Sequence, residues 1–275
     1  LRSCGYADIR ILPAVAVAAS DENNDIGVSG QHGVVIVSYG SEFGITHLGA
    51  DVLSIGAPND FNVNFGRGLA AGDFNGDGVD DLAVGAPGAD NVTSADVGIV
   101  MVYKGLAGVG ISLAPYITLD QADCGATVES GDQFGYTLCA GDMGGDGYAD
   151  LFVGSIGEDS SAGLVGFFPG SDDGITPTGS GFAKQSSLGG VDDAGALFGY
   201  SLALGDFIGD NYLDLAIGAP YGDDGSLLNV GKVYIVRGTA AGPVVTGGQI
   251  LTPLSLSVGV QPGGTFGWSL AAGSF

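Results

Sequence analysis

A ten-residue segment recurs four times along this 275-residue chain, and the recurrence restricts the folds that the chain can adopt. The copies read FGRGLAAGDF, FGYTLCAGDM, FGYSLALGDF and FGWSLAAGSF. They start 69, 64 and 68 residues apart, at Phe65, Phe134, Phe198 and Phe266. A second, apolar segment keeps a similar period and ends in glycine, at Gly40, Gly105, Gly170 and Gly238. Two independent markers with one period indicate a structural unit that is repeated along the chain.

Each unit is predicted to contain four short β-strands. In the unit that starts at Phe65, the strands are expected at 66–72, 81–85, 97–104 and 115–119. These apolar stretches alternate and are bounded by Gly, Asp or Pro, and no window has a convincing helical period. Four-stranded units of this length are typical of the blades of a β-propeller, whereas the repeats of a solenoid are usually shorter. The 53 glycines agree with many short strands joined by tight turns.

The two ends of the chain predict how such a propeller closes. The last copy supplies a lone first strand at 266–273, and GYADI at 5–9 matches GYADL at 147–151. Pairing 266–273 with a strand near 14–18 would complete a blade and remove a free sheet edge. We therefore expect one all-β propeller domain over 1–275 with four blades, at 266–275 plus 1–55, at 65–119, at 134–187 and at 198–254. The alternative is a segment of a longer array of blades.

The turns between first and second strands carry aspartates at alternating positions. The clearest turn reads DFNGDGVDD, with Asp73, Asn75, Asp77 and Asp81 at places 1, 3, 5 and 9. Val79, at place 7, offers its backbone carbonyl oxygen. A tight turn that directs alternate side chains inward suits Ca²⁺, which takes six to eight oxygen ligands. An EF-hand is excluded because place 12 is a valine and a strand follows instead of a helix.

Two further turns repeat this pattern with one side-chain ligand fewer, because place 3 is a glycine in DMGGDGYAD and an isoleucine in DFIGDNYLD. Their predicted ligands are Asp142, Asp146, Asp150 and the carbonyl of Tyr148, and Asp206, Asp210, Asp214 and the carbonyl of Tyr212. A fourth turn, split across the termini, would use Ser274, Cys4 and Asp8, and we expect no metal there. The sequence thus predicts about three calcium sites, strongest at 73–81 and weakest at 206–214.

The repeat resembles the FG-GAP consensus of integrin α propellers and related extracellular proteins in the order of its motifs, FG, then GDFNGDG, then DLAVGAP. The resemblance covers essentially the whole chain. It implies calcium in the aspartate turns, an extracellular location and a binding or adhesion role. Propellers of this family commonly have seven blades, so the alternative to a four-bladed ring is a segment of a seven-bladed propeller.

Little in the sequence favours catalysis. His32 and His47 are isolated, and no GxSxG, HExxH or GxxxxGKS motif occurs, so we predict that the chain is not an enzyme. A formal net charge of −24 disfavours nucleic acid and anionic lipid. No segment approaches the roughly 18–20 apolar residues of a membrane helix. Three cysteines, Cys4, Cys124 and Cys139, are too few for a disulfide scaffold.

The longest loops are predicted on the face opposite the aspartate turns, because strand connections alternate between the two ends of an up-and-down blade. Binding residues concentrate on such loops. These loops are acidic and suit a cationic protein partner or a calcium-bridged ligand; they span 21–32, 88–96, 120–133, 189–197 and 221–230. The second hypothesis is a carbohydrate-binding lectin, alone or attached to a secreted enzyme, with Tyr221 as its one aromatic candidate. Asn91 in Asn-Val-Thr is a candidate glycosylation site.

Overall fold

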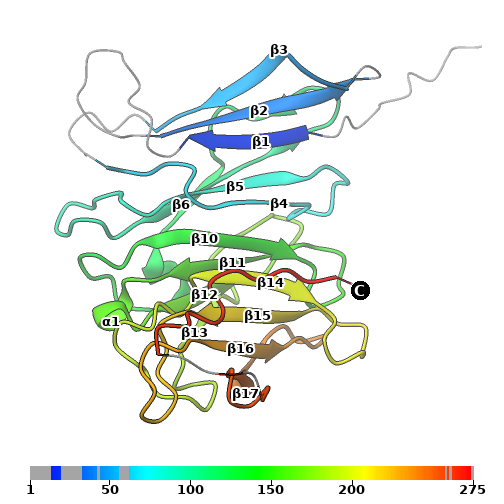
Figure 1. Cartoon of the computed structure of the whole chain (residues 1–275). Coiled ribbons are helices and arrows are strands. Elements are labelled where there is room, and N and C mark those ends of the chain that lie inside the picture. Colours follow the sequence, from blue (N-terminus) through cyan, green and yellow to red (C-terminus); the bar gives the residue numbers. More distant parts are fainter. Residues whose placement is uncertain are drawn as a thin grey trace, which may run out of the picture.

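The computed structural model describes residues 14–19, 33–41, 44–55, 62–257, 259 and 262–273. Its main architecture is a stack of antiparallel β-sheets, as the sequence predicted (Figure 1). Each of the four larger sheets is formed by strands from one continuous segment of the chain, and we call these four sheets blades I to IV. In the described part of the chain, no helix has the length and apolar character needed to cross a membrane.

The four strands of blade II fall within three residues of the ranges predicted for them. Blade I contains β1 (Ala14–Ala19), β2 (Val34–Ser41) and β3 (Gly44–Leu53). Blade II contains β4 (Leu69–Gly72), β5 (Asp81–Ala86), β6 (Ile99–Tyr103) and β9 (Ile117–Leu119). Blade III contains β10 (Phe134–Gly141), β11 (Asp150–Ser155), β12 (Leu164–Phe168) and β13 (Gly181–Ala183). Blade IV contains β14 (Ser201–Gly205), β15 (Asp214–Ala219), β16 (Lys232–Arg237) and β17 (Val244–Leu251).

The hydrophobic core lies between neighbouring sheets. Three clusters of buried side chains fill the interfaces of blades I and II, II and III, and III and IV. The phenylalanines of the recurring FG pairs, Phe65, Phe134 and Phe198, are fully buried in these clusters. Burying a side chain of this kind stabilises the fold by about 1.5–3 kcal/mol. Each blade therefore depends on its neighbours for stability, as repeat units do.

The repeated glycines mark where neighbouring sheets touch through their backbones. Gly135 of the FG pair has φ +89, a conformation that glycine adopts without strain. A Cβ on Gly85, in β5 of the preceding blade, would lie 2.0 Å from the carbonyl oxygen of Gly135. The same close approach recurs between Gly154 and Gly199 of blades III and IV, and between Gly218 of blade IV and Gly267 of the C-terminal segment. The recurring FG and the glycine of the second strand are therefore two sides of one contact between blades.

The predicted ring closure is not formed in this structure. β1 pairs with β2 alone, and residues 266–273 form no strand. Instead, the Phe266 N–H donates to the Val230 carbonyl (2.9 Å), and Ser201 Oγ donates to the Gly267 carbonyl (2.7 Å). The Phe134 N–H of blade III makes the equivalent hydrogen bond with blade II. The C-terminal segment therefore packs on the blade that precedes it, as every other FG pair does.

The pairing of 266–273 with 14–18 was therefore a wrong prediction for this structure. Blades I and IV lie at opposite ends of the stack, and the stack does not bring their edges together (Figure 1). Contacts between consecutive blades are specified locally in every repeat, whereas ring closure needs contacts between distant ends of the chain. The number of blades in a closed ring remains a prediction. The GYADI segment lies outside the described residues.

The elements that the sequence analysis missed are short and lie in connections. The hairpin of β7 (Gly105–Leu106) and β8 (Gly110–Ile111) follows the third strand of blade II. The 3₁₀ helix Gln121–Cys124 is capped by Asp120, and α1 (Glu158–Ser161) has positive φ at three of its residues. None of these elements spans enough residues to produce a readable hydrophobic period.

Candidate metal-binding turns and the loop face

The turn between β4 and β5 is held by its own polar side chains. The two carboxylate oxygens of Asp73 accept the backbone N–H groups of Asp77 (3.1 Å) and Gly78 (2.8 Å). Asn75 Oδ1 also accepts the Asp77 N–H (2.9 Å), and Asp77 Oδ1 accepts the Val79 N–H (3.0 Å). Short polar side chains stabilise tight turns by such bonds to the backbone that follows them. The side chains at places 1, 3 and 5 therefore bond within one turn.

Place 9 of the turn has a structural role that the sequence analysis did not predict. The Asp81 residue is 1% exposed, and its Oδ1 accepts the backbone N–H of Gly105 (2.8 Å). Gly105 is the glycine that ends the second recurring segment. A Cβ on Gly105 would lie 2.3 Å from the carbonyl oxygen of Asp80. The turn is thus tied to the end of the third strand, which explains why the two sequence markers keep one period.

Blades III and IV repeat both arrangements. The place-1 aspartates, Asp142 and Asp206, accept backbone N–H groups from places 5 and 6 of their own turns. The place-9 aspartates, Asp150 and Asp214, accept the N–H of the glycine that ends the third strand of their blade. The donor glycines and their distances are Gly170 (3.1 Å) and Gly238 (3.0 Å). One hydrogen-bond scheme therefore builds all three turns.

Negative charge is concentrated at these turns. Burial, together with the charges of Asp77 and Asp73, raises the pKa of Asp81 to about 6. The pKa of Asp150 is also raised, first by burial and then by the other two carboxylates of its turn. Both shifts mean that the ionised carboxylate is disfavoured where it stands. A cation placed among the carboxylates would reverse that effect.

The three turns differ at place 3 and in the cations beside place 5. Place 3 is Asn75 in blade II, a glycine in blade III and the exposed Ile208 in blade IV. In blade IV, Arg237 donates from Nε (3.2 Å) and Nη2 (2.7 Å) to Asp210 Oδ2, and this pair lowers the pKa of Asp210. In blade II, the nearest ammonium is that of Lys104, 3.7 Å from the place-5 carboxylate.

The described residues contain no group of three Asp, Glu, His or Cys side chains that is already arranged to hold a metal ion. The carboxylates of the turns accept backbone N–H groups instead. The first turn also offers two neutral oxygens, on the Asn75 side chain and the Val79 carbonyl. Carboxylate, amide and carbonyl oxygens on one turn are a donor set that fits Ca²⁺. The assignment of calcium to the three turns remains a prediction.

The long connections lie at the other end of the blades. Because β4, β5, β6 and β9 pair antiparallel in this order, the connections 87–98 and 120–133 lie opposite the turn 73–80. We call this end the loop face; α1 marks it at the left of Figure 1. The predicted loop 21–32 lies outside the described residues. The remaining predicted loops therefore share one end of the stack.

A buried polar cluster joins two connections of the loop face. Gln121 Nε2 donates to Asp132 Oδ2 (3.0 Å) and to Glu158 Oε2 (2.6 Å). Lys184 Nζ lies 2.8 Å from Glu158 Oε1 and 2.6 Å from Asp159 Oδ2. Burial is the main reason that the pKa of Asp132 is raised to about 6. Lys184 thus places a cation of the chain beside two carboxylates of this cluster.

The remaining predicted residues stay isolated from these groups. Asn91 lies in an exposed turn, where its Oδ1 accepts the N–H of Thr93 (2.9 Å) and of Ser94 (2.8 Å). These bonds do not use Nδ2, the atom that glycosylation would modify, and the modification stays a prediction. Cys124 and Cys139 are free thiols. The described part of the chain does not include the side chains of His32 and His47, nor the residues Cys4, Asp8 and Ser274.

The FG-GAP repeat family model matches residues 65–103, 134–181 and 198–236. Each match begins at the phenylalanine of a recurring FG pair and includes one aspartate turn and the strands on both sides of it. The chain is an FG-GAP repeat protein. This confirms the FG-GAP resemblance of the sequence motifs.

Among the relatives of this FG-GAP chain are integrin α chains. Integrin alpha-PS2 of Drosophila melanogaster is 30% identical over 214 residues, which cover 76% of this chain and 14% of the relative. Integrin alpha-V of Gallus gallus is 31% identical over 214 residues, or 74% of this chain and 18% of the relative. Phosphatidylinositol-glycan-specific phospholipase D of Homo sapiens is 43% identical over 91 residues, which cover 33% of this chain and 10% of the relative. The chain thus spans less than a fifth of the length of each of these relatives.

Proposed function

We propose that this FG-GAP chain is a non-catalytic binding or adhesion module that works outside the cell and is stabilised by Ca²⁺. The observation that carries the proposal is the hydrogen-bond scheme shared by three turns, each of which has aspartates at places 1, 5 and 9. The similarity to integrin α chains supports the extracellular location and the adhesion role.

Calcium would be held by places 1, 3, 5, 7 and 9 of the turn in blade II and by places 1, 5, 7 and 9 of the turns in blades III and IV. The ligands are Asp73, Asn75, Asp77, Asp81 and the Val79 carbonyl in blade II, and the aspartates and place-7 carbonyls named above in blades III and IV. A bound ion would supply the positive charge that offsets repulsion among the carboxylates. Ligand linkage gives about 2.7 kcal/mol per site when calcium is 100-fold above its dissociation constant. Extracellular sites commonly bind at 0.1–1 mM, so millimolar calcium should be needed.

The partner would be a protein that binds the loop face. This face carries the longest connections and is strongly acidic, and the chain as a whole has 31 acidic and 7 basic residues. Such a surface attracts a cationic partner and repels nucleic acid. The calcium turns lie at the opposite end of the blades, so calcium would act on the partner through the stability of the blades.

Thermal melts with calcium and with a chelator test the calcium part. The wild type should melt at a higher temperature in 2 mM calcium, and Asp77→Ala, Asp146→Ala and Asp210→Ala should each lose part of that gain, in decreasing order. The binding part is tested by probing an array of extracellular proteins with the immobilised chain in calcium and in chelator. Equal melting temperatures in both buffers would remove calcium from the proposal, and an array without a hit would count against the adhesion role.

A second candidate is a carbohydrate-binding module attached to a secreted enzyme, and the similarity to a phospholipase D is the observation that favours it. The predicted aromatic residue of such a module, Tyr221, packs edge to face on Trp268, with ring centroids 5.9 Å apart. Trp268 is 46% exposed and could stack on a sugar ring. A glycan array distinguishes the candidates, because binding that Trp268→Ala abolishes would favour the carbohydrate module.

A further inference from the structure

The turn between β4 and β5 contains the single Asn-Gly pair of the chain, Asn75-Gly76. In such a pair, the backbone nitrogen of the glycine can attack the side-chain amide of the asparagine, because glycine has no side chain that obstructs the approach. The product is a cyclic succinimide, which water opens to an aspartate. Asn75 is partly exposed and Gly76 is exposed, so water reaches both residues. This pair is therefore where the chain can lose a side-chain amide most easily.

The hydrogen bonds of the turns distinguish Gly76 from the glycines that follow aspartates, at which the same ring can form. The N–H of Gly78 donates to Asp73 Oδ2 (2.8 Å), and the N–H of Gly147 donates to Asp142 Oδ2 (2.9 Å). The Gly76 N–H has no hydrogen-bond acceptor among the residues that the structure describes. Its nitrogen therefore remains available as a nucleophile, whereas the nitrogens of the other two glycines are held.

The side-chain amide of Asn75 is activated at its oxygen. Oδ1 accepts the Asp77 N–H (2.9 Å), and a donor at this oxygen stabilises the negative charge that develops there during attack on Cγ. Nδ2 donates to Asp81 Oδ2 over 3.4 Å, which is long for a hydrogen bond. The nitrogen that must leave is thus held only weakly.

The fold requires the glycine of this pair for a separate reason. Gly76 has φ +69, a backbone conformation that glycine adopts without strain. A Cβ at this position would lie 2.8 Å from Cε1 of Tyr148, in the corresponding turn of blade III. A larger residue would therefore strain the backbone and displace the tyrosine ring. The contact between two turns thus keeps a glycine directly after Asn75.

We propose that Asn75 deamidates spontaneously, because its turn leaves the Gly76 nitrogen free. That nitrogen loses its proton to water and bonds to Asn75 Cγ, and Nδ2 leaves as ammonia with a proton from water. A water molecule then opens the succinimide. Cleavage between the Gly76 nitrogen and Cγ gives aspartate, whereas cleavage between that nitrogen and the main-chain carbonyl carbon of Asn75 gives isoaspartate. The reaction consumes one water and releases one ammonia, and it needs no enzyme or oxidant.

Deamidation would change the turn to which we assign calcium. An aspartate at place 3 adds a carboxylate beside those of Asp73 and Asp77, and a higher ligand charge strengthens calcium binding. Isoaspartate instead lengthens the backbone by a methylene group and should weaken binding. This consequence rests on the proposed function, whereas the reaction itself does not.

Peptide mapping by mass spectrometry tests the proposal. The protein is incubated in a mildly alkaline buffer without added calcium, circular dichroism confirms that it stays folded, and samples are digested at intervals. The peptide that contains Asn75 should gain one mass unit and yield both aspartate and isoaspartate. Asn211 is the internal control, because it is exposed in the equivalent turn of blade IV and precedes the bulky Tyr212. Asn75 should convert at least about tenfold faster, since an unobstructed intramolecular attack is fast.

Two variants separate the effect of the turn from that of the dipeptide. Ile208→Asn places an asparagine before Gly209, at the same place of the turn in blade IV. The Gly209 N–H donates to Asp206 Oδ1 (2.6 Å), so this nucleophile is held. The introduced asparagine should therefore convert several times more slowly than Asn75 in the same molecule. Asn75→Gln keeps an amide but requires a larger ring, and should abolish the conversion at this place.

The proposal is overturned if Asn75 keeps its amide in the folded protein while a synthetic peptide of residues 70–84 loses it. It is also overturned if Asn75 converts no faster than Asn211, or no faster than the asparagine introduced by Ile208→Asn. None of these measurements depends on calcium. Deamidation without any effect of calcium on the melting temperature would contradict the proposed function and leave this proposal standing, and the reverse result would do the opposite.

Discussion

The first and third aspartate turns have the same frame but different ligand capacity. In both, the place-9 aspartate is buried and accepts the N–H of a third-strand glycine, 2.8 Å for Asp81 and 3.0 Å for Asp214. The two turns differ at places 3 and 5. Asn75 offers an oxygen at place 3, whereas Ile208 offers none, and Arg237 already pairs with the place-5 carboxylate of the third turn.

This difference indicates that the regularly spaced places of a turn have two separate roles, one in the fold and one in metal binding. Place 9 ties the turn to the third strand, so the fold requires it whether or not a metal is bound. Place 3 differs between the two turns, yet both keep the backbone N–H groups that place 1 accepts and the glycine N–H that place 9 accepts. We therefore expect places 3 and 5 to set the difference in calcium affinity between the turns, and place 9 to serve both the fold and the metal site.

The largest effect is expected from the place-9 aspartates. Asp81→Ala and Asp214→Ala should each lower the free energy of unfolding by about 3 kcal/mol, because buried N–H groups lose their acceptor. The loss should appear in chelator and be similar for both turns. Asp172→Ala, an exposed aspartate outside the turns, is the matched control. Chemical denaturation measures the loss; a loss that appears only with calcium would make place 9 purely a metal ligand.

The glycines that meet place 9 should be nearly as sensitive. A Cβ on Gly238 would lie 1.9 Å from the Leu213 carbonyl oxygen, compared with 2.3 Å for the equivalent contact of Gly105. Gly238→Ala and Gly105→Ala should cost about 1–3 kcal/mol, since the backbone must shift. A Cβ on Gly144 would lie 3.9 Å from its nearest neighbour, so Gly144→Ala is the control. Equal stability of Gly238→Ala and Gly144→Ala would show that the tie between turn and strand is loose.

Exchanging place 3 between the two turns should exchange their calcium affinity. Asn75→Ile removes an oxygen from the first turn, and Ile208→Asn adds one to the third. Each should change the calcium concentration at half-maximal stabilisation about tenfold, in opposite directions, because ligand count sets the affinity of such sites. Calcium titrations of the melting temperature measure this. Identical midpoints in both variants and the wild type would exclude place 3 from the ligand set.

The smallest expected effect concerns the cation of the third turn. Arg237→Gln frees Asp210 from an exposed ion pair, and exposed pairs contribute little to stability. The variant should therefore melt as the wild type does in chelator. In calcium it should reach half-maximal stabilisation at about half the concentration, since one competing charge is gone. Weaker calcium binding would mean that Arg237 orients Asp210 as a ligand.

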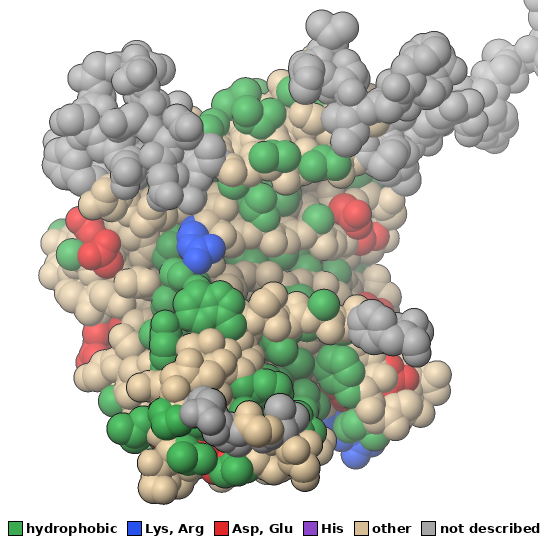
Figure 2. All heavy atoms as spheres, in the orientation of Figure 1, with side chains coloured by type: hydrophobic (Ala, Val, Ile, Leu, Met, Phe, Trp, Pro, Cys, Tyr) green, Lys and Arg blue, Asp and Glu red, His purple; other side chains and the backbone are tan. Residues whose placement is uncertain are grey.

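The fold could be predicted to the level of single strands because the repeats carry their own register. The buried phenylalanines and the contact glycines recur with each blade, so a local pattern specifies a local contact. The N- to C-terminal pairing could not be predicted in the same way, because no residue pattern distinguishes packing on the preceding blade from closure of a ring. The hydrophobic residues Val15, Val17, Ile36 and Val52 remain exposed on blade I, over which hydrophobic side chains gather in Figure 2.

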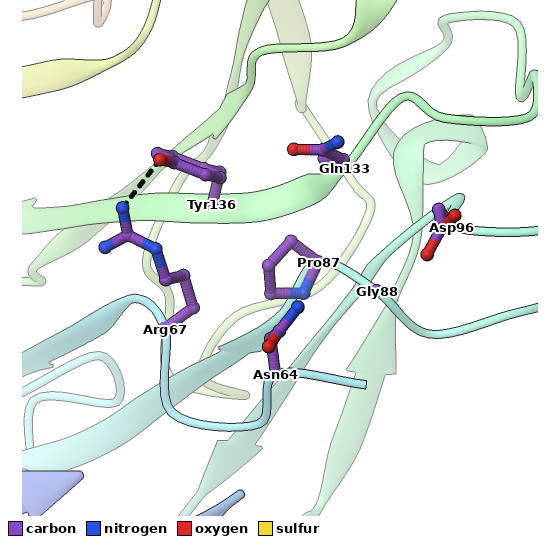
Figure 3. A pocket seen from close by; sticks show the side chains of 7 residues that line it. All are labelled: Asn64, Arg67, Pro87, Gly88, Asp96, Gln133 and Tyr136. Atoms are coloured by element: carbon purple, nitrogen blue, oxygen red, sulfur yellow. Dashed lines mark hydrogen bonds between the residues drawn. The ribbon is translucent and has the colours of Figure 1, made fainter. Parts of the chain in front are cut away.

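The candidate sites were predictable to a lesser extent. The alternating positions of the aspartates located the turns, but this pattern assigned the same role, metal binding, to all five places. The role of Asp81 depends on Gly105, 24 residues away in sequence, and is visible only in the folded chain. The pocket that Arg67 and Asp96 line draws on residues from two blades, so no pattern within a single repeat could indicate it (Figure 3).

The central claim is that the aspartate turns bind calcium, and calcium stoichiometry tests it most directly. Calorimetric titration of the metal-free protein should give up to three sites with dissociation constants near 0.1–1 mM. Asp77→Ala should remove the tightest site and leave the other two unchanged. Absence of any saturable binding at millimolar calcium, or an Asp77→Ala titration identical to that of the wild type, would contradict the account.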